Sequence, residues 1–346
     1  MIKRGVRRDM MEENQVIRWV KDVRKTDLEL FGKKCANLGE LYGGGFPVPF
    51  GFVIGLAAYE RFLKETGARD ELSTYFSTFK ADPNSPQDIS KFEEAERFAR
   101  GLVESKKMPA ELEELVMKYY SDLCRSLNKE EVWVSVRSSG PISRPGQYET
   151  YLFVRGEAEV LKHIVKVWSS TFNTRSLVAR ARAGLPLDYD PVGVAVIEMV
   201  DAKSAGVAFS FEPGSFSLLT MAIEGCWGLG EGVVSGRVSV DRWFVDRRTL
   251  TPVRRQIPRK TEEFVIEDPE KGGATFKLVP PERQKIPCLT EQEVKALAEL
   301  TLKVEKHFGQ PQDVEWAIRK DLEPPESLVL LQARPQKISK GKFGLM

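Results

Sequence analysis

The chain has 346 residues, of which 42% are apolar and 29% charged, so it is long enough for about two folded domains, and its composition excludes collagen-like, low-complexity and disordered classes. Its 52 lysines and arginines nearly balance its 50 aspartates and glutamates, which argues against a protein that mainly binds nucleic acid but leaves a small anionic ligand open. The four cysteines lie far apart without a C-x-x-C pair, as expected in a reducing cytoplasm rather than in a zinc site or a disulfide framework.

The hydropathy pattern predicts neither a targeting segment nor a membrane span. Residues 1–15 are basic and no apolar run follows them, so we expect a frayed arm rather than a secretory signal. The longest apolar runs, 192–200 and 217–223, are well short of the roughly 20 residues that a membrane helix needs. We therefore expect no membrane partner.

The N-terminal half combines helical patterns with two short strands. Helices are expected over 32–41, 88–105, 109–127 and 157–184, and strands over 52–54 and 132–137. The second strand ends at Arg137 and leads into a loop over 138–150 that is rich in serine, glycine and proline. Hydroxyls and available backbone N–H groups suit an anion, so we interpret this loop as a candidate anion cradle; an ordinary surface loop is the alternative.

The C-terminal half is predicted to be rich in strands, in an α+β fold of two parts. Strands are expected over 192–200, 206–211, 218–223, 238–245, 312–318 and 328–334. Thr290 and Glu293 form a capping box, which predicts a helix that Gly309 ends. We place the domain boundary near 186–192, with an N-terminal lobe over 1–188 and a C-terminal lobe over 189–346.

The last two strands place four polar side chains where they could meet. The two-residue period puts Asp313 and Glu315 on one face of the first strand, and Gln332 and Arg334 on one face of the second. If the strands pair as a hairpin around 320–327, the four side chains share one surface. Mg²⁺ is usually held by one or two carboxylates plus substrate phosphates, and a guanidinium suits the phosphates. An exposed strand face with ion pairs is the alternative.

Two neighbouring lysines have an unusual place in the first predicted helix. Lys33 and Lys34 lie in its first turn, where the helix dipole disfavours cations unless an anion is bound there. This placement makes them candidate anion ligands. Solvated lysines are the alternative.

Several other kinds of site are disfavoured by the motifs. There is no G-x-x-x-x-G-K-[ST] segment, and the glycines of 228–232 do not have the G-x-G-x-x-G spacing of a dinucleotide site. His163 and His307 both lie in predicted helices, away from glycine-rich or hydroxyl-rich loops. We therefore expect structural histidines, and neither a Ser-His-Asp nor a Cys-His catalytic arrangement.

Seven short motifs, taken in chain order, carry a family resemblance. They are GKKCANLGEL (32–41), PVPFGF (47–52), SVRSS (135–139), GQYET (146–150), WGLGE (227–231), DVEW (313–316) and QARP (332–335). Together they resemble the ATP-binding domain of the phosphoenolpyruvate synthase and pyruvate phosphate dikinase family, over nearly the whole chain. The resemblance implies an ATP-grasp-type fold of two lobes, with the nucleotide in the cleft between them.

The resemblance also implies roles for individual residues, with ATP and Mg²⁺ as the cofactors. Carried over by motif position, the catalytic residues are Lys34, Arg137 and Arg334; the ATP-binding residues are Gly146, Thr150, Glu198, Val200 and Gln332; and the metal ligands are Asp313 and Glu315. The positive charges would hold and neutralise the phosphates, which is what phosphoryl transfer chiefly requires of a protein.

The chain departs from the family pattern at three places, one of which is the stretch after Arg137, which is shorter than in the synthases and more like the dikinase form. The family's Gly-Gly-Lys-Gly start is Gly-Lys-Lys-Cys over 32–35, so both lysines are candidates, and the spacing along the motif favours Lys34. Ile197 stands where many members have glutamine. The adenine contact is therefore expected from Glu198 and from the backbone around 199–200.

A partner subunit is the remaining expectation from the resemblance. In the family, a swivelling domain with a phosphoacceptor histidine in a glycine-rich loop follows the ATP-binding domain, and neither His163 nor His307 lies in such a loop. We expect the tail 338–346 to be a natural ending and the histidine to come from a separate subunit. Within the family, the sequence most resembles the stand-alone ATP-binding subunit of phenylphosphate synthases, which are split in this way.

This resemblance implies a cytoplasmic dikinase-type phosphotransferase subunit. The subunit would transfer the diphosphoryl group of MgATP to the partner histidine and release AMP, and the phosphoryl group would finally reach phenol. The alternatives are a split phosphoenolpyruvate synthase, an antibiotic phosphotransferase component, a non-catalytic ATP-sensing module, and an ATP-grasp ligase, which would release ADP.

Overall fold

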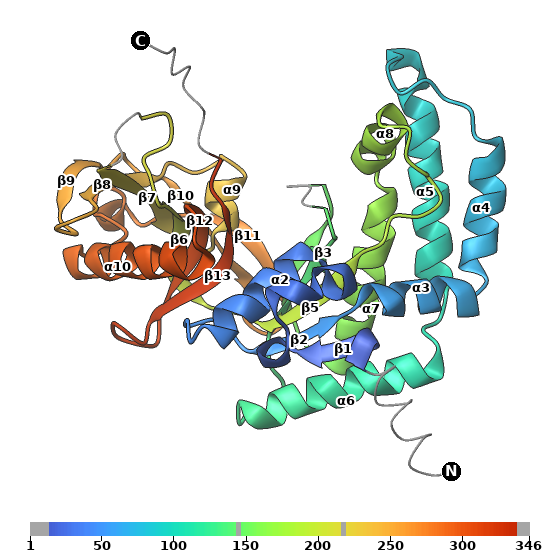
Figure 1. Ribbon diagram of the computed structural model, residues 1–346, viewed down its shortest axis with the longest axis horizontal. Helices are drawn as coiled ribbons and strands as arrows, with labels where there is room; N and C mark the ends of the chain where they lie inside the picture. Colours follow the sequence, from blue (N-terminus) through green and yellow to red (C-terminus); the bar gives the residue numbers. More distant parts are fainter. Residues whose placement is uncertain (1–13, 143–146, 216–218, 338–346) are drawn as a thin grey trace. The chain divides into compact units, whose positions relative to one another are not determined.

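The computed structural model shows a mixed architecture of helices and several β-sheets (Figure 1). It describes residues 14–142, 147–215 and 219–337. The contacts divide the chain into two compact units: unit 1 is Met1–Glu40 with Phe50–Met199, and unit 2 is Leu41–Pro49 with Val200–Met346. Residues 193–198 belong to unit 1, beyond the expected boundary at 188/189, because they form a central strand of its sheet.

Unit 1 is built on a five-stranded sheet with the order β1-β2-β5-β3-β4. The strands are β1 (Ile17–Trp19), β2 (Gly51–Ile54), β3 (Val134–Ser139), β4 (Thr150–Val154) and β5 (Gly193–Glu198). Each neighbouring pair is antiparallel. The helices are α2 (Leu28–Gly43), α3 (Leu56–Glu65), α4 (Ala68–Thr78), α5 (Ile89–Ser105), α6 (Ala110–Ser126), α7 (Glu157–Ser169) and α8 (Thr174–Arg182), with the 3-10 turns η1 (Val20–Asp22), η2 (Lys25–Asp27), η3 (Pro86–Asp88) and η4 (Ser170–Phe172).

The main core of unit 1 lies between one face of this sheet and its helices. Val134, Val136 and Val196 from the sheet share this core with large aromatic side chains such as Phe62 and Trp168, all of them buried. Burial of this apolar surface is the dominant favourable contribution to folding. The helix α2 contacts the sheet as well, since the Cys35 N–H donates to Ser139 Oγ at the end of β3.

The segment 157–184 is not the single helix that its apolar stripe suggested. The helix α7 ends at Ser169, η4 follows, and α8 begins at Thr174. Asn173 has an extended backbone, and its side chain accepts a hydrogen bond from the Ser176 N–H at 2.8 Å, which is the geometry of an N-cap. The prediction of one continuous helix was wrong because this cap starts a new helix within an uninterrupted apolar pattern.

Unit 2 contains a six-stranded sheet with the order β13-β12-β6-β7-β8-β9, and a separate hairpin, β10-β11. The strands are β6 (Ala202–Phe209), β7 (Thr220–Trp227), β8 (Asp241–Asp246), β9 (Pro252–Gln256), β10 (Glu262–Asp268), β11 (Gly272–Leu278), β12 (Gln312–Arg319) and β13 (Leu328–Pro335). The helices are α9 (Glu231–Val234) and α10 (Glu291–Phe308), with the turn η5 (Pro281–Arg283). The β12-β13 hairpin and the helix α10, with its Thr290–Glu293 capping box and its left-handed Gly309, are confirmed.

The core of unit 2 forms between α10 and one face of the six-stranded sheet. Val294 and Leu297 of α10 are buried in one cluster with Ile223, Trp316 and Leu330 of the sheet. Among the described residues, no helix combines the length and the apolar character that crossing a membrane would require.

Candidate functional site

The four polar residues of the β12-β13 hairpin do lie side by side. In the observed register Asp313 is opposite Arg334, and Glu315 is opposite Gln332. Arg334 donates from Nε to Asp313 Oδ2 at 2.8 Å, and its Nη2 is also 2.8 Å from that oxygen. Residues directly opposite each other in a sheet have their side chains on one face. The hairpin therefore brings together two carboxylates, a carboxamide and a guanidinium, as predicted.

A β-bulge keeps these polar side chains out of the core. Glu315 pairs with Gln332, but the next residue, Trp316, pairs with Leu330, so Leu331 is an extra residue in β13. A bulge of this kind shifts the alternation of one strand relative to its partner. Trp316 and Leu330 thus face α10 in the buried cluster, and the polar residues occupy the opposite face of the sheet.

Among the four hairpin residues, Asp313 has the carboxyl group whose pKa is shifted by its surroundings. It is only 9% exposed, and its Oδ1 is buried without a hydrogen-bond partner among the described residues. Burial raises the pKa of the Asp313 carboxyl; the charge of Arg334 opposes this shift and the charge of Glu315 adds to it. A buried carboxylate oxygen without a partner is costly unless a cation or a donor reaches it.

These residues fit a Mg²⁺ ion that is shared with phosphate oxygens. Within the described ranges, no group of three or more histidine, cysteine, aspartate or glutamate side chains could hold a metal. Mg²⁺ does not require such a cage, since it is usually bound through one or two carboxylates, water and substrate phosphates. Asp313, with its unpartnered oxygen, and Glu315, beside it on the same face, would supply the two carboxylates.

The same sheet face carries a charged pair that the sequence pattern did not indicate. Glu315 is opposite Val207 of β6, which is opposite Glu224 of β7, which in turn is opposite Arg242 of β8. Arg242 Nε donates to Glu224 Oε1 at 2.8 Å. Two strand spacings, about 10 Å, separate Glu224 from Glu315 along this row. Only the order and register of the strands reveal this alignment, because the residues are far apart in the sequence.

The lysine motif lies where α2 restarts against the end of β3. Gly32 interrupts the helix with φ 77° and ψ 165°, and a Cβ there would collide with the Ser139 carbonyl. The Lys33 N–H donates to the Gly140 carbonyl at 2.9 Å, and the Cys35 N–H donates to Ser139 Oγ at 3.0 Å. These bonds satisfy N–H groups that a helix start leaves without partners. The first turn, with its two lysines, is therefore joined to the strand that carries Arg137.

In unit 1, Arg137 lies beside Thr150, and both Arg137 and Lys34 lie near Cys35. Arg137 is directly opposite Thr150 in the β3-β4 pairing, so both side chains lie on the same face. Burial raises the pKa of the Cys35 thiol to about 11, while the nearby positive charges of Lys34 and Arg137 act in the opposite direction. Both cations thus lie close enough to influence one thiol. Thr150, expected at the end of a loop, begins the strand β4.

The segment before Thr150 is held by polar contacts from several elements. The Asn173 side chain donates to the Gln147 carbonyl at 2.6 Å, and the Glu149 N–H donates to Ser170 Oγ at 3.2 Å. The Tyr148 hydroxyl donates to the Asp190 carboxylate. Gly146, the remaining expected ligand in this loop, lies outside the described residues.

The expected adenine-binding segment is the end of β5 and the residues that follow it. Glu198 pairs with Val134, so its side chain is on the face opposite to that of Arg137. The Glu198 N–H donates to the Phe50 carbonyl at 2.8 Å, and the Met199 N–H donates to the Trp133 carbonyl at 2.7 Å. Val200 is the first residue after the boundary and is buried in unit 2.

The WGLGE motif is anchored to the β10-β11 hairpin. Gly228 has φ 76°, and a Cβ there would meet the Phe264 carbonyl. The Leu229 N–H donates to that carbonyl at 2.7 Å, and Trp227 Nε1 donates to the Arg283 carbonyl at 3.2 Å. Only glycine fits this positive φ beside a neighbouring backbone. Among the described residues, the motif therefore forms a turn that packs against the neighbouring backbone.

Comparisons with known proteins identify a matching family. A family model described as "Pyruvate phosphate dikinase, AMP/ATP-binding domain" matches residues 28–344. The chain belongs to this family. It is 37% identical over 335 residues to a probable phosphoenolpyruvate synthase of Methanocaldococcus jannaschii, a match that covers 94% of this chain and 27% of the relative. Membership of the family supports an ATP-utilising module of the dikinase type.

Other relatives have similar names and the same pattern of coverage. The chain is 34% identical over 354 residues to a probable phosphoenolpyruvate synthase of Staphylothermus marinus, covering 94% of this chain and 42% of the relative. It is also 34% identical over 354 residues to the phosphoenolpyruvate synthase of Aeropyrum pernix, covering 94% of this chain and 43% of the relative. The chain therefore spans between a quarter and a half of the length of these relatives.

Proposed function

We propose that this chain binds MgATP and transfers the β,γ-diphosphoryl group to a histidine, releasing AMP. The β12-β13 hairpin is the observation that carries the proposal, because it places Asp313 and Glu315 beside Gln332 and Arg334 on one sheet face, in a chain of an AMP/ATP-binding family. Carboxylates for Mg²⁺ and a guanidinium for phosphate are the groups that such a transfer needs.

The proposal includes an ATP-grasp-type arrangement in which both units contact one nucleotide. Lys34, Arg137 and Thr150 would bind phosphate oxygens from unit 1, while the hairpin residues would do so from unit 2. The backbone at 199–200 would contact the adenine. What supports this is that each unit by itself places residues of these types on paired strands or at a helix start, where groups suited to phosphate can be held rigidly.

The diphosphoryl transfer and the formation of phosphohistidine would take two steps. An imidazole nitrogen attacks the β-phosphorus, the bond from this phosphorus to the α,β-bridging oxygen breaks, and AMP leaves with that oxygen. Hydrolysis of the resulting diphosphohistidine then releases phosphate and leaves phosphohistidine. Mg²⁺, bound with the nucleotide, would neutralise phosphate charge, and Lys34, Arg137 and Arg334 would orient the β- and γ-phosphates and stabilise the charge that develops on them.

We propose that the acceptor histidine lies on a separate subunit. The two described histidines have structural surroundings. His163 Nδ1 is 2.7 Å from the Glu159 carbonyl oxygen and its ring packs on Tyr151, and His307 packs between Phe46 and Phe308. Both lie in helices, where a phosphoryl group would meet packed neighbours rather than an accommodating loop.

The final acceptor divides the proposal into two forms. The split design that this sequence resembles favours phenol, as in phenylphosphate synthase. The names of the relatives favour pyruvate, the acceptor of a phosphoenolpyruvate synthase. Both forms share the transfer to histidine and the release of AMP, so they differ only in the last step.

One labelling experiment tests the shared chemistry. The purified chain is incubated with Mg²⁺ and β-³²P-labelled ATP, with and without a candidate histidine-bearing partner protein, and nucleotides and protein label are followed. Label on the partner together with AMP is expected, and phenol or pyruvate then identifies the acceptor by removing that label. ADP as the product would indicate a ligase, and ATP bound without transfer would indicate a sensing module.

A further inference from the structure

Glu149 is joined to a helix outside the sheet by a two-point ion pair. Arg100 of α5 donates from Nη1 to Glu149 Oε1 at 2.7 Å and from Nη2 to Glu149 Oε2 at 3.1 Å. The Tyr151 hydroxyl also donates to Glu149 Oε2. A bidentate arginine–carboxylate pair defines a direction as well as a distance, because the guanidinium is planar and rigid.

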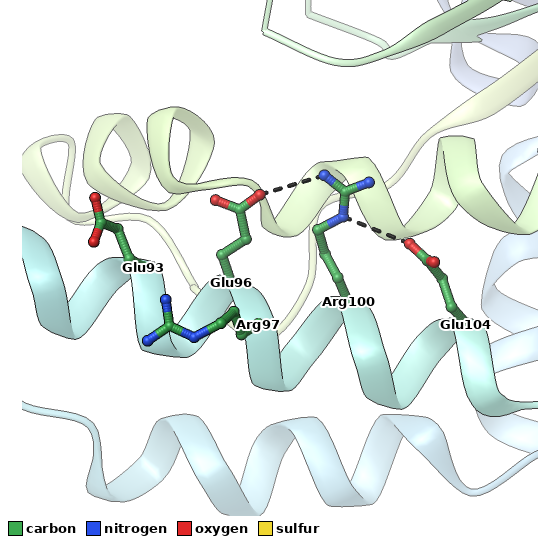
Figure 2. A pocket seen from close by; sticks show the side chains of 5 residues that line it. All are labelled: Glu93, Glu96, Arg97, Arg100 and Glu104. Carbon is green, nitrogen blue, oxygen red and sulfur yellow. Dashed lines mark hydrogen bonds and ion pairs between the residues drawn. The ribbon is translucent and has the colours of Figure 1, made fainter.

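The Arg100 guanidinium is itself held in place on α5. Figure 2 shows it between two carboxylates of the same helix: Nη1 is 3.3 Å from Glu96 Oε1, and Nε is 3.5 Å from Glu104 Oε1. These acids are fixed in turn, since Glu96 accepts from the N–H and the hydroxyl of Thr174, and Glu104 accepts from the Ser169 hydroxyl. Arg100 is therefore a preorganised anchor on a rigid helix rather than a mobile surface cation.

Arg100 thus holds the residue next to Thr150, which the proposed function assigns to ATP binding. Glu149 immediately precedes Thr150, and Thr150 is directly opposite Arg137 in the β3-β4 register. The Glu149 backbone N–H is also fixed, by Ser170 Oγ at 3.2 Å. Holding both the side chain and the backbone of Glu149 restricts where β4 begins, and hence where the Thr150 hydroxyl lies relative to the Arg137 guanidinium.

We infer that Arg100, acting through Glu149, is a positioning residue for the ATP phosphates. The inference rests on the proposed function, in which Thr150 and Arg137 bind the phosphates of ATP. Arg100 itself does not contact the nucleotide and acts only by fixing the positions of these two residues. Loss of the pair leaves the fold in place but lets the start of β4 move. Phosphate recognition then weakens while recognition of the adenosine part does not.

The test compares two nucleotides on the same variants. Arg100→Ala, the milder Arg100→Lys and Glu149→Gln are measured for MgATP and for AMP binding by calorimetry, with thermal unfolding recorded for each. We expect the dissociation constant for MgATP to rise about 2- to 30-fold and that for AMP to change by less than about twofold, the range seen when residues act on a ligand indirectly. General destabilisation would weaken both nucleotides together.

A matched control and a double variant complete the test. Figure 2 shows a surface pocket that Arg97 and Arg100 both line. Arg97→Ala removes an exposed arginine of α5 that has no ion pair among the described residues, so this variant is expected to bind both nucleotides normally. The double variant Arg100→Ala/Glu149→Gln is expected to lose no more MgATP affinity than the more affected of the two single variants Arg100→Ala and Glu149→Gln.

The outcomes separate the inference from the proposed function. If the unmodified chain does not bind MgATP, the proposed function fails and this inference fails with it. If the unmodified chain binds MgATP and the Arg100 and Glu149 variants bind it equally well, the inference alone fails. Equal losses for MgATP and AMP, or additive losses in the double variant, would also overturn it.

Discussion

Arg334 and Asp313 are directly opposite each other across the β12-β13 hairpin, and Arg334 Nε donates to Asp313 Oδ2 at 2.8 Å. The guanidinium proposed to bind phosphate thus also orients the carboxylate proposed to bind Mg²⁺. Only one carboxylate oxygen is used in this pair, and Oδ1 keeps its capacity for a cation.

Replacing Arg334 is therefore expected to abolish transfer without unfolding the chain. The Arg334 side chain is 38% exposed, so its ion pair contributes about 1 kcal/mol or less to stability, which Arg334→Ala would remove. The phosphate contact and the orientation of Asp313 are lost together. ATP-dependent labelling of the histidine partner and a urea titration measure the two effects. Unchanged labelling would contradict the assignment of this hairpin to the nucleotide site.

The restart of α2 predicts a pair of stability changes of opposite sign. Gly32→Ala is expected to destabilise the chain by about 1–3 kcal/mol, because alanine strains at φ 77° and its Cβ collides with the Ser139 carbonyl. The control is Gly101→Ala in α5, where a Cβ meets nothing within 4 Å, and which is expected to stabilise by about 0.4–1 kcal/mol. Chemical denaturation of both variants tests the contrast, and equal effects would refute the assigned role of Gly32.

Ser139→Ala tests the bond from β3 to the lysine turn. Ser139 Oγ accepts from the Cys35 N–H as a capping residue would, although the two residues are far apart in the chain. Its loss is expected to cost about 1 kcal/mol of stability and to weaken MgATP binding, because the first turn with Lys34 is released. Denaturation and calorimetry provide the measurements. A stability loss with unaltered MgATP affinity would show that this turn does not contact the nucleotide.

The buried ion pair of unit 2 is expected to matter far more than an exposed one. Lys260 Nζ is 2.6 Å from Asp241 Oδ1, with side-chain exposures of 1% and 0%. Lys260→Met leaves an uncompensated buried carboxylate and is expected to cost about 3–5 kcal/mol. The matched control is Lys320→Met, which breaks the exposed pair with Asp201 and is expected to cost less than about 1 kcal/mol. Similar free energies of unfolding for the two variants would contradict this difference.

The lowered pKa of His163 leads us to expect that the free energy of unfolding falls on mild acidification. Burial lowers the pKa of this imidazole below 6.5; the bond to the Glu159 carbonyl opposes the shift and the charge of Lys166 adds to it. A folded-state pKa below the unfolded value means that the unfolded chain binds the proton first. The contribution of His163 is thus favourable above pH 6.5 and is lost as the pH falls through its folded pKa. His163→Gln is expected to flatten this part of the stability profile, and an imidazole titrating above pH 6.5 by NMR would reverse the sign.

Local sequence patterns predicted a helix or strand correctly where the residues that define it lie within that element. The capping box at Thr290 and the glycine at 309 predicted α10, and the two-residue alternation predicted that Asp313 and Glu315 share a face. Local patterns failed where an element depends on its neighbours. The strands β9, β10 and β11 had not been anticipated, and the break at Asn173 lies within an unbroken apolar stripe.

The sequence by itself determined the family and most of the candidate residues, because seven short motifs in a given order depend only on residue identity and spacing. Outside the β12-β13 hairpin, the tertiary structure alone decided which residues lie side by side. Arg137 lies opposite Thr150, Ser139 caps the lysine turn, and Arg100 holds Glu149 through contacts between distant segments. Such contacts follow from strand register and helix packing, which side chains throughout the core settle together and which no short motif encodes.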